Sequence, residues 1–84
     1  MEQAINDVCN EIRDMLIAKN RAYGNSAADP VRIFSKVDAL EQIKVRIDDK
    51  LSRISRGHEY MNEDTVRDLA GYLILMLIVE KMQD

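Results

Sequence analysis

The sequence predicts an all-α protein, a small three-helix unit that assembles into a homo-oligomeric helical bundle. Two stretches repeat apolar residues at spacings of three and four, the period of an amphipathic helix, and a third is a nearly continuous apolar run. With three Gly and one Pro, the chain has few of the turn residues that many short strands would need. Because 84 residues can enclose only one hydrophobic core, residues 1–84 are expected to form a single helical domain.

The first helix is predicted over residues 2–20. Its apolar stripe consists of Ile5, Val8, Cys9, Ile12, Met15 and Leu16. Gly24 lies shortly past its end, where a left-handed residue can stop a helix. In the connector that follows, Asp29 and Pro30 can begin a single helical turn, with the acid as cap and proline in the first position. Cys9 is expected to be a packed thiol on the stripe.

The second helix is predicted to begin at Asp38. Asp38 and Glu41 have the spacing of a capping box, in which the Glu41 side chain reaches back to the cap. The apolar stripe of this helix consists of Leu40, Ile43, Ile47, Leu51 and Ile54. Gly57 supplies the stop signal.

The third helix is predicted to begin near Asn62, with Glu63 and Asp64 in the first turn, where the helix dipole favours acids. Residues 69–79 are then apolar on nearly every side. Such a helix needs cover all round, and two short partner helices cannot provide it. We therefore expect residues 69–79 to contact another copy of the chain. This run is too short to cross a bilayer, which takes about 20 residues, so no membrane partner is expected.

Charge is distributed unevenly along the chain. The formal net charge is −3, but residues 32–58 are basic and both flanking segments are acidic. A DNA-coating domain is usually basic as a whole, so nucleic acid is not an expected partner. A basic centre suits a pocket for a small anion, although a solvated mixed-sign helix surface is the alternative. A lone cysteine and the lack of a secretion signal at the N-terminus favour a cytoplasmic location.

Three bases share one flank of the second predicted helix, namely Arg46, Lys50 and Arg53. Long basic side chains beside an apolar stripe can lie over it and carry their charge to the edge of a cleft. Guanidinium groups suit phosphate oxygens, and an ammonium group adds a point charge. The alternative is that these three bases pair with acids of a neighbouring helix.

Two acids, Asp64 and Asp68, share a face of the third predicted helix because four residues make about one helical turn. Two carboxylates at the mouth of a buried face must be neutralised, either by a cation such as Mg²⁺ or by Arg and Lys of the second helix.

The connector after the first helix carries a polar cluster. Tyr23 offers a flat ring on which a base can stack, and Gly24 lets the backbone approach a ligand closely. Asn25 and Ser26 supply donors and acceptors for a base edge or a ribose. The same residue types are also ordinary loop chemistry.

Taken together, three motifs resemble a known group of proteins. They are Lys19-Asn20-x-x-Tyr23-Gly24-Asn25-Ser26, Asp49-Lys50-x-x-Arg53 and Asp64-x-x-x-Asp68-x-x-Gly71-Tyr72. The segment resembles small bacteriophage proteins of the nucleotide-modification-associated domain family, relatives of the all-α, MazG-like nucleoside triphosphate pyrophosphatases. The resemblance implies a MazG-like helical fold and a nucleotide site, to which Lys19 and Tyr72 would also contribute.

The pyrophosphatase relatives are expected to hold Mg²⁺ between two acid pairs on facing helices. Here the second helix lacks its pair, because Arg46 stands three residues before Asp49 and Val45 three before Asp48. Metal-assisted hydrolysis needs enough carboxylates to hold the ion and orient water. Arginine in place of an acid favours holding a phosphate over cleaving it.

The leading hypothesis is therefore a phage-type protein that binds a phosphorylated nucleotide, cyclic or linear, and sequesters this signal of host immunity in the host cytoplasm as an anti-defence function. Its expected ligand-binding residues are Lys19, Tyr23, Gly24, Asn25, Ser26, Arg46, Lys50, Arg53, Asp68 and Tyr72, with no cofactor. The alternative is a Mg²⁺-dependent nucleotide pyrophosphatase with Asp49, Asp64 and Asp68 as metal ligands. A further alternative is a helical assembly module without a ligand.

Overall fold

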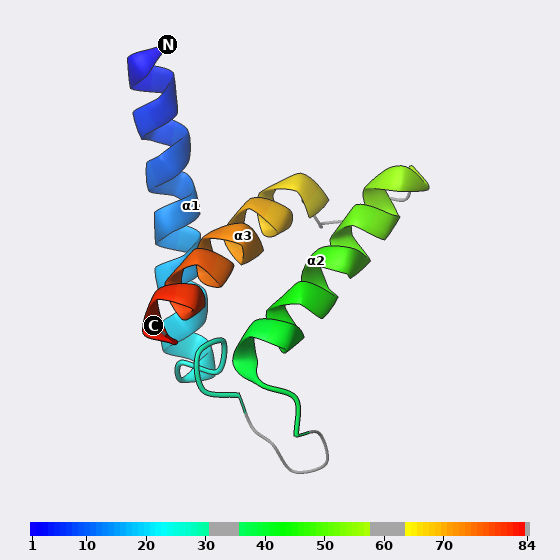
Figure 1. Cartoon of the computed structure of the whole chain (residues 1–84). Helices are drawn as coiled ribbons and strands as arrows, with labels where there is room; N and C mark the ends of the chain where they lie inside the picture. The colour runs from blue at the N-terminus through cyan, green and yellow to red at the C-terminus, as the bar shows by residue number, and fades with distance from the viewer. Residues whose placement is uncertain (31–35, 58–63, 84) are drawn as a thin grey trace.

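A computed structural model describes residues 1–30, 36–57 and 64–83 of the chain. It contains three helices, α1 (Glu2–Tyr23), α2 (Ala39–Ser55) and α3 (Thr65–Met82) (Figure 1). No strand occurs in these three ranges. The predicted all-α class and the three predicted helices are confirmed.

Helix α3 lies between the other two helices (Figure 1). It packs along α2, where Ala39, Ile43 and Val79 form the buried core. Helix α1 crosses α3 at Gly71, and a Cβ placed on this glycine would lie 3.1 Å from side-chain atoms of both Leu16 and Met15. The fold is thus a tight α2–α3 pair with α1 attached to α3 by its C-terminal half.

Helix α1 continues three residues beyond the predicted end. Gly24 then adopts a left-handed conformation with a φ of 61° and donates its N–H to the carbonyl of Asn20. Nothing between residues 21 and 23 opposes a helix, since neither glycine nor proline occurs there. The prediction that Gly24 ends the helix is confirmed, and Asn25 follows it in the same left-handed region.

Both other helices begin at an aspartate cap. Asp38 accepts a hydrogen bond from the Glu41 N–H at 2.9 Å, while the Glu41 carboxylate pairs with Lys44 at 3.2 Å instead of reaching back. Asp64 accepts from the Arg67 N–H at 3.0 Å, so α3 begins at Thr65 and not near Asn62. The residues expected around that earlier start, 62 and 63, and those of a turn after Pro30, 31–35, lie outside the described ranges.

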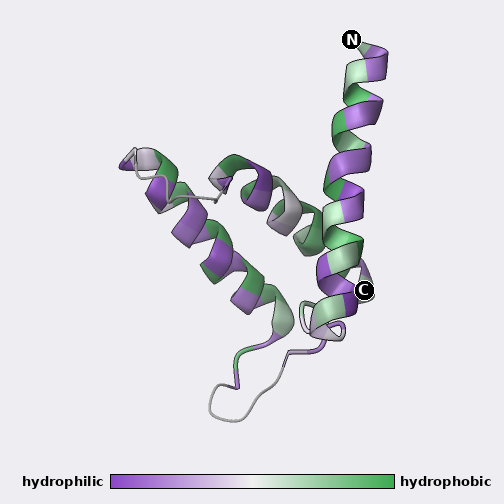
Figure 2. Ribbon diagram, turned by 180° about the vertical axis from the view of Figure 1, so that it is seen from behind, coloured by the Kyte–Doolittle hydropathy of each residue, from purple (hydrophilic) through white to green (hydrophobic). Residues whose placement is uncertain are grey.

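The N-terminal half of α1 projects from the rest of the molecule (Figure 1). Ile5 and Val8 are both more than half exposed, and hydrophobic residues recur along α1 up to its N-terminal end (Figure 2). Cys9 is exposed, so its predicted packing inside the domain is wrong: the first buried residue of α1 is Ile12. None of the helices in the described ranges has the length and hydropathy needed to cross a bilayer.

Candidate functional site

A cavity of about 500 Å³ opens where the C-terminal half of α1 faces α2 across α3. Its apolar lining comes from all three helices and includes Leu16, Ile43 and Leu75. Gly71 is part of the same surface. Because glycine has no side chain, Leu16 and Met15 of α1 can pack closely against α3 at this point. The volume falls within the range of about 300–1,000 Å³ typical of small-molecule sites.

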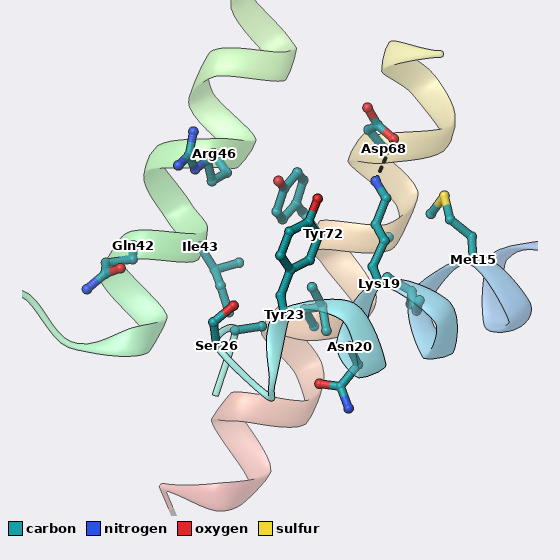
Figure 3. Close-up of a pocket in the computed structure, with 14 residues that line it drawn as sticks. Met15, Lys19, Asn20, Tyr23, Ser26, Gln42, Ile43, Arg46, Asp68 and Tyr72 are labelled. Carbon is teal, nitrogen blue, oxygen red and sulfur yellow. Dashed lines mark ion pairs between the residues drawn. The ribbon is translucent and has the colours of Figure 1, made fainter. Parts of the chain in front are cut away.

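Two tyrosines line this cavity. Tyr23 stands in the last turn of α1 and is 70% exposed, whereas Tyr72 is half-buried on α3 and also packs against the core. Figure 3 shows both rings within the site. Aromatic faces of this kind can stack with a planar ligand.

Arg46 lies on the α2 side of the cavity (Figure 3). It is exposed, and no ion pair or side-chain hydrogen bond joins its guanidinium to any residue of the ranges 1–30, 36–57 and 64–83. Gln42 lines the cavity one turn earlier on the same helix and donates its side-chain N–H to the Val37 carbonyl. The α2 wall therefore presents a guanidinium without a protein anion in the described ranges.

The Asp68 carboxylate joins all three helices. Its Oδ1 lies 3.6 Å from Lys19 Nζ of α1, and its Oδ2 lies 3.7 Å from Lys50 Nζ of α2. The Lys50 side chain is only 9% exposed, compared with 53% for Lys19. Desolvation opposes a buried charge without a counter-ion, so this pairing accounts for a lysine in the α2–α3 interface.

The structure brings six of the ten expected ligand-binding residues together around one cavity: Lys19, Tyr23, Ser26, Arg46, Asp68 and Tyr72. The other four lie elsewhere. Gly24 ends α1 and Asn25 follows it in the turn. Lys50 contacts Asp68 from inside the α2–α3 interface, and Arg53 pairs with Asp49 at 3.4 Å.

We expected three bases of α2, namely Arg46, Lys50 and Arg53, to converge on one anion, and the structure does not bring them together in this way. The three bases do share a flank of α2, but only Arg46 lines the cavity. Lys50, one turn later, is covered by α3 and meets Asp68, which is the pairing that the sequence left open as an alternative.

Sequence reasoning missed Asn20 and Gln42 as lining residues. A signal existed for each. Asn20 stands within the motif that contains Lys19 and Tyr23, and Gln42 precedes Arg46 by four residues, which places both on one face of α2.

The three acids of the pyrophosphatase alternative lie in separate ion pairs. Asp49 pairs with Arg53, Asp64 with Arg67, and Asp68 with the two lysines. In the part of the chain that the structure describes, no three His, Cys, Asp or Glu residues lie close enough together to hold a metal ion. The Mg²⁺ alternative thus has no carboxylate cluster in these ranges.

A second polar contact fixes α1 to α3 beside the cavity. Arg67 donates to Glu11 at 3.1 Å and to Asp64 at 3.3 Å. The hydrogen bond from the Arg67 backbone N–H, followed by that from its side chain, lowers the pKa of Asp64. The hydrogen bonds to Glu11 and then Asp64 raise the pKa of Arg67.

Comparison of the chain with models of known protein families, with curated proteins and with solved structures found no match.

Proposed function

We propose that this protein binds a phosphorylated nucleotide in the cavity between α1, α2 and α3. The observation that carries the proposal is Arg46, a guanidinium that has no anionic partner in the described ranges and shares one cavity with Tyr23 and Tyr72. Guanidinium groups bind phosphate oxygens through two parallel hydrogen bonds. Aromatic rings can stack on any of the nucleobases, because every base has a flat π-face.

The rest of the lining supports the same ligand class. Leu16, Ile43 and Leu75 provide an apolar surface that suits one face of a base or a sugar. Asn20, Ser26 and Gln42 add amide and hydroxyl groups around it, and such groups can donate to and accept from a base edge. A small anion alone would need none of this apolar surface.

We favour binding over hydrolysis because Arg46 occupies the position at which an acid pair would be needed to hold Mg²⁺. The resemblance to small phage proteins related to MazG-like pyrophosphatases supports a nucleotide as the ligand. In this proposal the protein lowers the concentration of unbound signal nucleotide in the cytoplasm of a phage-infected cell.

A thermal-shift screen with linear and cyclic nucleotides tests the proposal. A ligand at 100 times its Kd should stabilise the folded protein by about 2.7 kcal/mol. Arg46→Met should abolish the shift, whereas Arg56→Met is the matched control, since Arg56 is exposed at the end of the same helix and is not part of the cavity lining. The absence of a shift with every nucleotide, or equal loss in both variants, would contradict the proposal.

The same samples distinguish binding from turnover. Nucleoside triphosphates incubated with the protein and Mg²⁺ are expected to emerge intact from chromatography. Release of pyrophosphate would contradict the sequestration proposal and would support the pyrophosphatase alternative. Mass spectrometry of small molecules released from the heat-denatured protein would identify a co-purifying ligand directly.

We also infer that copies of the chain associate. The chain exposes 6590 Å², whereas a compact monomer of 9.7 kDa exposes about 5,100 Å². The excess of roughly 1,500 Å² is larger than the ~800 Å² that each partner contributes to a standard interface. It includes an apolar stripe on α3 formed by Val66, Leu73 and Leu77, each more than 40% exposed.

A further inference from the structure

Asp68 is the one acidic residue among the described residues that line the cavity. Two lysines from different helices share its charge, Lys19 from α1 and Lys50 from α2. Both N–O distances, 3.6 and 3.7 Å, are long compared with the ~2.7–2.9 Å of a charge-assisted hydrogen bond. Neither ion pair is therefore a short charge-assisted hydrogen bond.

The two lysines do not depend equally on Asp68. The Lys50 side chain is nearly buried, and moving its ammonium group away from a carboxylate in a region of low dielectric constant is costly. The Lys19 side chain is 53% exposed, and water can solvate its ammonium group when the ion pair opens, which makes an exposed pair weak. Lys19 is therefore the lysine that can change partners.

We propose that Lys19 leaves Asp68 when the ligand binds and contacts its phosphate oxygens, so that Lys19 and Arg46 together select a nucleotide with two negative charges. The proposal rests on the proposed nucleotide-binding function. Figure 3 shows the two cations on opposite sides of Tyr23 and Tyr72, with Lys19 reaching in from α1 and Arg46 from α2. A ligand with one negative charge can satisfy only one of them.

The ammonium group of Lys50 explains how Lys19 can leave Asp68. When Lys19 moves, Asp68 keeps Lys50 beside its other oxygen, so no carboxylate is left unpaired in a half-buried position. The flexible four-carbon stem of lysine lets its ammonium group move without displacement of α1. Lys19 thus belongs to the binding site, and Lys50 to the support of Asp68.

Two kinds of nucleotide carry the required charge. A 5′-monophosphate has both charges on one phosphate, since its second pKa is about 6, and a cyclic dinucleotide has one charge on each of two phosphodiesters. The shared chemistry is a pair of negative charges on phosphate oxygens. A 3′,5′-cyclic mononucleotide carries one such charge, and a nucleoside carries none.

Isothermal titration calorimetry at pH 8 with these four kinds of probe, each with all four bases, tests the proposal. For the wild-type protein, a doubly charged probe should bind most tightly, then the cyclic mononucleotide, then the nucleoside. Comparison of the monophosphate with the cyclic dinucleotide identifies the source of the two charges. Lys19→Met should weaken binding of the doubly charged probe about ten- to a hundredfold, the effect of losing one hydrogen bond to a charged group, and Lys19→Arg should restore most of it.

Lys44→Met is the matched control. It removes the same charge from an exposed lysine that pairs with Glu41 on α2 and is not part of the cavity lining. Circular dichroism of each variant establishes that the helices are retained, and Lys19→Gln gives a second neutral variant.

Three outcomes are informative. Equal effects of Lys19→Met and Lys44→Met, or preference of the wild-type protein for the singly charged probe, would overturn the role of Lys19 while nucleotide binding stands. A wild-type protein that binds none of the probes would overturn the proposed function and this inference together. Selective loss of the doubly charged probe in the two neutral Lys19 variants would support the inference.

Discussion

Gly71 determines how closely two helices of this protein approach each other. A Cβ at this position would lie 3.1 Å from Leu16 Cδ2 and 3.1 Å from Met15 Cε, closer than most carbon contacts in proteins. The residue is buried and also lines the cavity. Replacing it therefore changes both the attachment of α1 and the shape of the site.

Gly71→Val should destabilise the fold by about 1–3 kcal/mol, the usual cost of overpacking, and should weaken nucleotide binding. Ala70→Val places the same β-branched side chain on the preceding, less buried residue of α3 and controls for helix propensity. Urea unfolding and calorimetry measure the two effects. Equal destabilisation by both substitutions would show that the contact with Leu16 and Met15 is unimportant.

Asp64 makes stability depend on pH. Its pKa is lowered in the folded protein, first by the hydrogen bond from the Arg67 backbone N–H. A carboxylate with a lowered pKa contributes stability above its unfolded pKa of about 4, and this contribution is lost as the pH falls through the folded pKa.

Asp64→Asn should therefore have a lower Tm than the wild-type protein at pH 6, and the difference should shrink below about pH 4. Thermal unfolding of both proteins between these values measures it. A difference that stays constant down to pH 2.5 would mean that the charge of Asp64 does not contribute to stability.

At the scale of the element, local signals determine where helices begin and end. Asp38 and Asp64 cap α2 and α3, and Gly24 ends α1 in a left-handed conformation. A Cβ on Gly24 would meet no atom within 4 Å, so its requirement for glycine comes from the backbone alone. The role of Gly24 at the helix end can therefore be tested apart from the role in ligand binding that the sequence suggests.

Gly24→Ala should cost about 1 kcal/mol, because a left-handed conformation is unfavourable for a residue with a Cβ. Gly24→Asn should cost less, since asparagine tolerates this region. Chemical denaturation measures both changes, and nucleotide affinity should stay the same in either variant. A large loss of affinity without loss of stability would instead place Gly24 in the site.

The elements could be predicted from the sequence because their causes are local. Apolar spacing located the first two helices and a continuous apolar run located the third, and the glycine and aspartate signals located most of their ends. The composition of the site was harder to predict, because it depends on how helices rotate against one another. Arg46 and Lys50 differ by one turn on the same flank, yet one lines the cavity and the other meets Asp68 beneath α3.

At the scale of the whole molecule, the chain is more open than its length requires. Its radius of gyration is 13.9 Å, whereas a compact domain of 84 residues has about 12 Å. Ile12, Ala39, Ile43 and Val79 are the buried hydrophobic residues in the described ranges. So small a core favours further burial through association.

Sedimentation velocity should accordingly show a species larger than the 9.7 kDa chain. Leu73→Glu combined with Leu77→Glu should shift it towards the monomer, because two charges would then have to be buried in the α3 stripe. Val45→Glu is the control, since Val45 is 62% exposed on α2, on a different helix. A monomeric wild-type protein at all concentrations would contradict the inferred association.

The projecting half of α1 has a consequence for motion. Residues 2–11 are all exposed, and a helical segment this short is only marginally stable in water without packing. In a monomer, their backbone amides should therefore exchange with deuterium much faster than those near Gly71, as expected of a segment that opens locally. Assembly that covers this segment would slow the exchange, so that the first three turns of α1 would report, peptide by peptide, whether a partner has arrived.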